Sequence, residues 1–212
     1  TTAAGDIMEL RQRGPRDFLI WHGGQVLMNS KAQRSEMALG TLGCRTLGDA
    51  PAPRVLVGGL GMGFTLRAAL DALPAAARVV VAELNPRIVE WCRGPLADLT
   101  RNAVSDLRVK VAIGDVADCI RRCAAGTLDA VILDLYHGPG PGLDAEHDPL
   151  YGQGAIARTH TALGTGGTLA VWGEDYDGGF YKRLDRGGFA VTCERPGRGG
   201  YRHAVYLATK HP

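Results

Sequence analysis

The segment from residue 54 to residue 83 constrains the fold of this chain more than any other. It begins with the apolar residues 55–57, which predict a buried parallel strand. A turn with four glycines follows, and then a helix with apolar residues at i, i+3, i+4 and i+7 from Leu66. Pro74 ends that helix, and a second apolar strand ends on Glu83. This order predicts a nucleotide-binding βαβ unit, in which the acid accepts hydrogen bonds from ribose hydroxyls.

The spacing of the glycines narrows the choice of nucleotide. Gly59, Gly61 and Gly63 are spaced G-x-G-x-G, and Phe64 stands where the dinucleotide motif G-x-G-x-x-G needs its third glycine. The dinucleotide motif directs a helix N-terminus at a pyrophosphate, whereas G-x-G-x-G is typical of sites for S-adenosylmethionine (AdoMet), which carries no phosphate. Many strand–helix turns contain two glycines for steric reasons alone, so a purely structural turn remains the alternative.

The rest of the chain continues the alternation of strands and helices. Apolar runs predict five further strands, at residues 107–113, 128–133, 167–172, 189–193 and 201–208. The pattern predicts an α/β, Rossmann-like AdoMet-methyltransferase fold with a seven-stranded, mostly parallel sheet whose last strand is antiparallel. It also predicts a short β-hairpin at residues 17–28 after a loose lead-in at residues 1–16, and a helix at residues 30–47. We therefore expect an N-terminal arm, hairpin and linking helix in residues 1–50, and an AdoMet-binding catalytic domain in residues 51–212.

Composition excludes several classes of protein. The chain has 212 residues, 45% of them hydrophobic and 22% charged, which is ordinary for one globular α/β domain. A net charge of +2 is too small to indicate a nucleic-acid partner. Five cysteines argue against a disulfide framework, and Cys119 and Cys123 lack the nearby ligands that a metal site needs. With no apolar stretch of membrane-spanning length and no signal-peptide pattern, we expect a cytoplasmic protein without a membrane or metal partner.

Polar and aromatic residues follow several of the predicted strands. In an open α/β sheet the ligand binds beyond the carboxyl ends of the strands, so these residues are the candidates for chemistry. Asp134 ends an apolar strand, where an unpaired carboxylate is costly, and this favours a functional role. For three others a structural alternative stays open: Asp115 is suited to an adenine amino group or to a helix N-cap, His137 to a general base or a surface position, and Trp172 to a pocket wall or the core.

Four stretches resemble the spermidine synthase (aminopropyltransferase) branch of the class I AdoMet-dependent methyltransferase superfamily. They are VLVGGLGMGFTLR at residues 55–67, VAELNP at 81–86, GDV at 114–116, and LDAVILD at 128–134 followed by Gly138-Pro139. The resemblance extends from about residue 25 to residue 208. It implies that Glu83 holds the cofactor ribose, that Asp115 contacts the adenine and that Asp134 faces the reacting atoms. Its full implied cofactor set is Gly59, Gly61, Met62, Gly63, Glu83, Leu84, Asp115, Val116 and Asp134.

Two departures from the family pattern bear on function. Met62 stands where the family's glycine motif carries the aspartate that grips the free amine of decarboxylated AdoMet. His137 stands where the family has a second loop aspartate that holds the amine substrate. A buried ammonium group without a partner is costly, so these losses argue against aminopropyl transfer.

We therefore expect an AdoMet-dependent methyltransferase that acts on a small-molecule acceptor. Asp134, with Tyr136 or His137, would orient or deprotonate the acceptor, and the loop at 138–142 would form part of its pocket and a lid. Trp172, Glu174 and Asp175 would bind the acceptor. One alternative is an aminopropyltransferase that uses decarboxylated AdoMet, with amine contacts from Glu174, Asp175 or Asp177. The other alternative is a non-catalytic nucleoside-binding protein. The resemblance to the family also implies a homodimer, with the hairpin as the contact.

Overall fold

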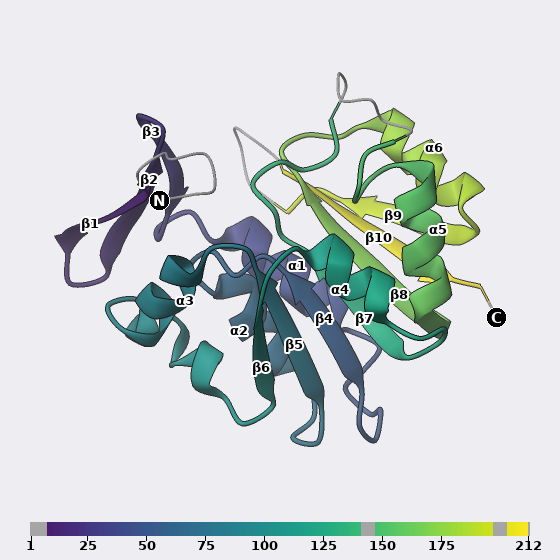
Figure 1. Ribbon diagram of the computed structural model, residues 1–212, viewed down its shortest axis with the longest axis horizontal. Helices are drawn as coiled ribbons and strands as arrows, with labels where there is room; N and C mark the ends of the chain where they lie inside the picture. The colour runs from purple at the N-terminus through teal and green to yellow at the C-terminus, as the bar shows by residue number, and fades with distance from the viewer. Residues whose placement is uncertain (1–7, 141–146, 197–202, 212) are drawn as a thin grey trace.

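The computed structural model describes residues 8–140, 147–196 and 203–211, and its N-terminal part is a three-stranded antiparallel sheet (Figure 1). The strands β1 (Met8–Gly14), β2 (Asp17–His22) and β3 (Gln25–Asn29) lie in the order β1-β2-β3. The predicted hairpin is therefore confirmed, whereas the expectation of a loose lead-in through residue 16 is wrong. The alternation of apolar and polar residues in β1 is too weak to predict a strand, because polar residues fill most of it. This strand forms through its pairing with β2.

A seven-stranded sheet forms the centre of the molecule. Its strands lie in the order β6-β5-β4-β7-β8-β10-β9, and β10 runs antiparallel to both of its neighbours. This confirms the predicted architecture. The strands are β4 (Arg54–Gly58), β5 (Arg78–Glu83), β6 (Val109–Ile113), β7 (Leu128–Leu133), β8 (Leu163–Gly173), β9 (Phe189–Glu194) and β10 (Ala204–Lys210). Strand order reverses between β4 and β7, which is where an open α/β sheet leaves a crevice for a ligand.

Helices cover both faces of this sheet, because alternate residues of its central strands enter two separate cores. Val55 and Val57 of β4 pack into one core with α1 to α3, and Leu56 packs into the other with α4 to α6. The helices are α1 (Arg34–Gly43), α2 (Phe64–Ala72), α3 (Pro86–Arg93), α4 (Val116–Arg122), α5 (Gln153–Ala162) and α6 (Gly178–Arg186), with 3₁₀ turns η1 (Ala97–Thr100) and η2 (Ala103–Ser105). Among the described residues, no helix has the length and apolar character that crossing a membrane requires.

Local capping fixes where two of the site-bearing helices begin. Asn85 accepts a hydrogen bond from the Arg87 amide at 3.0 Å, with Pro86 in the first turn of α3. Asp115 accepts one from the Ala117 amide at 2.8 Å at the start of α4. The N-cap considered for Asp115 in the sequence is thus confirmed. Helix α1 is shorter than the predicted 30–47, and the proposed domain boundary near residue 50 stays a prediction.

Candidate active site

A cavity of about 1250 Å³ lies at the carboxyl ends of the central strands. On one side its lining comes from the ends of β4, β5, β6, β7 and β8 and the residues that follow them. On the opposite side it comes from the N-terminal sheet and the start of α1. Pockets for one small ligand have volumes of roughly 300–1,000 Å³. This cavity therefore has room for a nucleoside-type molecule and a second, smaller one.

The glycine turn after β4 lets the backbone approach both the neighbouring strand and the N-terminal sheet. Gly59 has a φ of 86°, and a Cβ atom there would overlap the backbone oxygen of Asp134. A Cβ at Gly61 would lie 2.6 Å from the sulfur of Met28 in β3. Gly59 and Gly61 line the cavity, so the turn forms its floor while Met28 covers it.

Glu83, at the end of β5, is held by two backbone donors. Its Oε2 accepts a hydrogen bond from the Leu60 amide and its Oε1 accepts one from the Asn85 amide, both at 2.8 Å. The side chain is buried and faces the cavity. A carboxylate has about four acceptor positions, so each oxygen retains capacity for one further donor, such as a ribose hydroxyl.

An apolar wall and a second acid lie next to Glu83. Leu84 is 72% exposed although it is apolar, and it lines the cavity together with Val116. Asp115 also lines the cavity, and its Oδ1 is used by the cap of α4 while the side chain is otherwise exposed. A flat heteroaromatic ring with an amino group would cover Leu84 and donate to Asp115. The two roles considered for Asp115 are thus compatible.

Asp134, directly after β7, carries the perturbed carboxyl group of the cavity. Burial raises its pKa, a hydrogen bond from Thr65 lowers it, and the nearby negative charge of Glu36 raises it again, to about 7 in total. The Thr65 Oγ1 atom lies 2.5 Å from Asp134 Oδ2. A carboxyl group with a pKa near neutrality can accept and release a proton at physiological pH.

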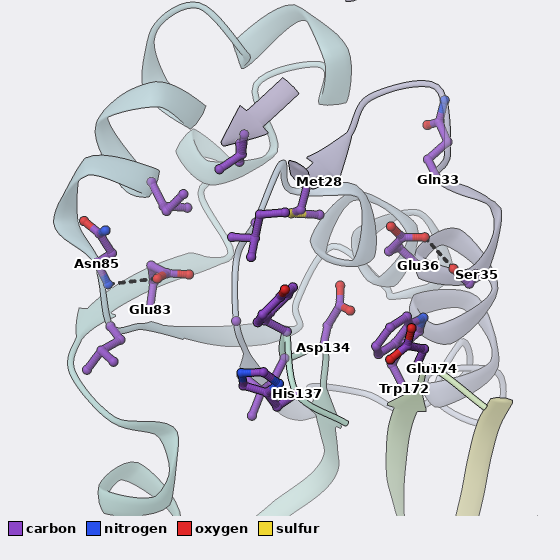
Figure 2. Close-up of a pocket in the computed structure, with 18 of the residues that line it drawn as sticks. Met28, Gln33, Ser35, Glu36, Glu83, Asn85, Asp134, His137, Trp172 and Glu174 are labelled. Carbon is purple, nitrogen blue, oxygen red and sulfur yellow. Dashed lines mark hydrogen bonds between the residues drawn. The ribbon is translucent and has the colours of Figure 1, made fainter. Parts of the chain in front are cut away.

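Acidic and aromatic side chains surround the end of the cavity away from Glu83. Figure 2 shows Glu83 and Asn85 on one side, Glu36, Trp172 and Glu174 on the other, and Asp134 between them. Among the described residues, Nε1 of Trp172 is buried without a hydrogen-bond partner. This end of the cavity thus presents three carboxyl groups and an indole ring.

The remaining predicted residues fall into two groups. Tyr136 and His137 line the cavity with their ring centres 4.5 Å apart. Met62, Gly63 and Asp175 do not line it: Met62 is fully buried in the core, and Asp175 pairs with Arg195. Within the predicted loop at 138–142, residues 141 and 142 lie outside the described part of the chain.

Three residues at the site were not predicted from the sequence, namely Met28, Glu36 and Thr65. Glu36 stands in the first turn of a helix, and Thr65 comes two residues after the last glycine of the turn, so both offered weak signals. Met28 offered none, because an apolar residue in a strand reads as core. The packing of the N-terminal elements over the sheet brings Met28 and Glu36 to the cavity, and Thr65 of α2 contacts the site through its hydrogen bond to Asp134.

No protein-family model matches the chain. A putrescine N-methyltransferase of Nicotiana tabacum is 33% identical over 129 residues, which are 60% of this chain and 32% of that protein. A polyamine aminopropyltransferase of Streptomyces coelicolor is 36% identical over 123 residues, covering 57% of this chain and 21% of its own length. The matches thus span about a fifth to a third of these relatives.

The spermidine synthase of Thermotoga maritima superposes with a TM-score of 0.75 over 99% of this chain and 71% of its own, at 18% sequence identity. The fold is therefore that of the spermidine synthase-like branch. The resemblance stated from the sequence motifs is confirmed, and both methyl- and aminopropyl-transferring enzymes are among the relatives.

Proposed function

We propose that this protein is a transferase that binds AdoMet and moves its methyl group to a small-molecule amine. One observation carries the proposal: a single cavity joins a carboxylate fixed by backbone donors, Glu83, to a carboxyl group poised to take a proton, Asp134. The first suits the ribose of a nucleoside-type donor, and the second suits a nucleophile that must lose a proton before it attacks.

The donor would occupy the side of the cavity formed by β4, β5 and β6. Glu83 would accept hydrogen bonds from the ribose hydroxyls, Leu84 and Val116 would cover the adenine, and Asp115 would accept from its amino group. The glycine turn at 59–61 gives the ligand close access to the backbone. This placement directs the sulfonium group of the donor toward the middle of the cavity, where Asp134 lies (Figure 2).

The acceptor would occupy the other side. Glu36, Asp134 and Glu174 supply negative charge, and Trp172 supplies an aromatic face, so a cationic amine is the class of small molecule that this end suits. Asp134 would take one proton from the ammonium group, leaving a neutral amine whose lone pair attacks the methyl carbon. The carbon–sulfur bond then breaks and leaves S-adenosylhomocysteine, and the methylated ammonium product keeps the positive charge.

Methyl transfer is favoured over aminopropyl transfer because, among the residues that the structure describes, the glycine turn supplies no carboxylate for the donor's side chain. Met62 stands in the core, so it contributes neither charge nor side-chain contact to the cavity. Of the acids that the alternative requires, Asp175 pairs with Arg195 and Asp177 caps α6 by accepting from Gly179 and Phe180. Only Glu174 of these three lines the cavity.

Product analysis tests this proposal. The protein is incubated with AdoMet or with decarboxylated AdoMet, each with a panel of mono-, di- and triamines, and the products are identified by mass spectrometry. We expect a product that has gained one methyl group, formed from AdoMet alone. A product that has gained an aminopropyl group from the decarboxylated donor would overturn the proposal in favour of the aminopropyltransferase.

A further inference from the structure

The hydroxyl group of Thr65 lies between the two parts of the chain that meet at the acceptor end. Thr65 is the second residue of α2 and is 2% exposed. Its Oγ1 lies 2.5 Å from Asp134 Oδ2 and 3.1 Å from the backbone oxygen of Glu36 in α1. Helices α1 and α2 approach closely here. Gly40 of α1 permits this approach, since a Cβ at that position would overlap the backbone oxygen of Thr65.

The Thr65 hydroxyl has more acceptors within reach than it has protons to donate. A hydroxyl group has one proton to donate, and here two acceptors lie within reach of it. When Asp134 is ionised, Thr65 donates to its carboxylate. When Asp134 is protonated, Asp134 donates to Oγ1, and Thr65 donates in turn to the carbonyl of Glu36. The hydrogen bond between Thr65 and Asp134 is therefore present in both protonation states, whereas the Glu36 carbonyl accepts from Thr65 only when Asp134 is protonated.

We propose that Thr65 is a positioning residue that holds one oxygen of Asp134 in place before and after proton transfer and leaves the other to the acceptor. Among the residues that the structure describes, no hydrogen bond reaches Oδ1 of Asp134, and the carboxyl group points into the cavity (Figure 2). Thr65 also ties Asp134 to the backbone of α1, which brings Glu36 to the same end. The proposal rests on the proposed function for its catalytic meaning, but the hydrogen-bond exchange itself does not.

Other titratable groups face Asp134 and must be separated from the effect of Thr65. Glu36 from α1 raises the pKa of Asp134, and Asp134 in turn raises that of Tyr151, which precedes α5. His137, on the same loop as Asp134, and Glu174, after β8, line the same cavity. Glu36→Gln should lower the pKa of Asp134, which is opposite to the expected effect of removing the Thr65 hydroxyl.

The variants that test this role are Thr65→Val, which keeps the shape of the side chain but removes the hydroxyl, and Thr65→Ser, which keeps the hydroxyl. Thr159→Val is a matched control, because Thr159 is also 2% exposed and donates to a helix carbonyl, that of Ala155, at 3.0 Å. It loses a buried hydroxyl of the same kind without touching the cavity. Thr65→Ala provides a second variant that lacks the hydroxyl if the valine variant does not fold.

The first measurement is the titration of the Asp134 carboxyl carbon by ¹³C NMR, with the signal assigned by its absence in Asp134→Asn. The hydrogen bond to the ionised carboxylate is stronger than the one to the neutral carboxyl group, and this difference sets the shift, so Thr65→Val should raise the midpoint by roughly one pH unit. Thr65→Ser and Thr159→Val should leave it within a few tenths. An unchanged midpoint in Thr65→Val and Thr65→Ala would overturn the proposal whatever the activity.

The second measurement is the pH dependence of kcat/KM with the amine identified by product analysis. The activity of Thr65→Val should rise with pH at a limb displaced upward by the same amount, and Thr65→Ser should restore the original limb. A displaced NMR titration without methyl transfer to any amine would reject the proposed function but keep the hydrogen-bond exchange. An activity loss that is the same at every pH would reduce Thr65 to a structural residue and overturn the positioning role.

Discussion

The two carboxyl groups that end β5 and β7 differ in how the protein holds them. Glu83 receives two backbone amides at 2.8 Å, one on each oxygen. From the described part of the chain, Asp134 receives a single side-chain hydroxyl, and its pKa is raised to about 7. Backbone donors stabilise only the ionised form, since they cannot accept a proton in return. A hydroxyl can reverse its role and serve both forms.

This difference supports the different tasks that we propose for the two acids. Two backbone donors fix the direction of the Glu83 side chain, as we propose for a group that recognises a ligand. Burial raises the pKa of Asp134 and so favours its neutral form, as expected for a group that we propose takes up a proton during turnover. The strands on the two sides of β4 thus carry, at their carboxyl ends, the acid that we propose for ligand binding and the acid that we propose for proton transfer.

The largest expected effect is that of Asp134→Asn on turnover. The amide keeps the size of the carboxyl group but cannot accept the proton, and general-base catalysis contributes roughly 10²–10⁴-fold. We expect kcat to fall within that range while the Kd for AdoMet changes less than about threefold. Steady-state kinetics and calorimetry measure the two quantities. Wild-type turnover in this variant would show that Asp134 is no base, and loss of donor binding would contradict the division between the two acids.

The same substitution should also change how stability depends on pH. Asp134 has a higher pKa in the native state, about 7, than the ordinary value of 3.8, so the native state holds this proton more tightly. The free energy of unfolding of the wild type should therefore fall as pH rises from about 4 to 7, by up to about 4 kcal/mol.

Asp134→Asn removes this dependence. Chemical denaturation should show the variant more stable than the wild type at pH 8, with the difference disappearing near pH 4. Parallel pH profiles for the two proteins would mean that burial does not perturb Asp134, and the contrast with Glu83 would then fail.

Glu83→Gln should weaken donor binding. The amide retains a carbonyl oxygen but replaces the other acceptor by an NH₂ group that faces a backbone N–H donor, and hydrogen bonds to charged groups are worth about 1.5–3 kcal/mol. We expect a roughly 10- to 100-fold higher Kd for AdoMet by calorimetry. Glu90→Gln, on the exposed side of α3, is the control and should bind as the wild type does. Unchanged affinity in Glu83→Gln would place the donor elsewhere.

The smallest effects on acceptor binding are expected from substitutions of two neighbouring acids, Glu174 and Asp175. Glu174 lines the cavity, whereas Asp175 pairs with Arg195 outside it. Glu174→Gln should raise the KM for the amine about two- to fivefold, since an exposed charge pair contributes up to roughly 1 kcal/mol. Asp175→Asn should leave KM and kcat unchanged. The reverse ranking in steady-state assays would mean that the acceptor approaches from the side of Asp175.

Local signals in the sequence predicted most of the catalytic fold. The apolar strands, the glycine turn and the caps Asn85 and Asp115 each depend on neighbouring residues, so a single chain displays them. The strand β1 was not predicted, because Met8 and Leu10 are its only large apolar residues. One of its polar residues, Arg11, instead contacts the neighbouring strand, where its guanidinium lies 4.4 Å from the ring centre of Trp21. Such a strand forms through its partner rather than through its own pattern.

The site was predictable where residues follow a strand directly. Glu83 and Asp134 belong to this class, and both line the cavity. Thr65 and Asp134 are 69 residues apart, and Thr65 and Glu36 are 29 apart. Their meeting depends on how tightly α1 packs against α2, which no local pattern reveals. The direction of the Met62 side chain, into the core, likewise follows from the path of the turn and not from its spacing.

The most direct test of the central claim is a calorimetric comparison of AdoMet and decarboxylated AdoMet binding to the wild-type protein. Met62, whose side chain lies in the core, stands where a carboxylate would grip the free amine of decarboxylated AdoMet, so we predict tighter binding of AdoMet. The affinity should fall in Glu83→Gln and persist in Asp134→Asn. Clear preference for the decarboxylated donor would contradict the methyltransferase, and binding of neither donor would contradict an AdoMet site altogether.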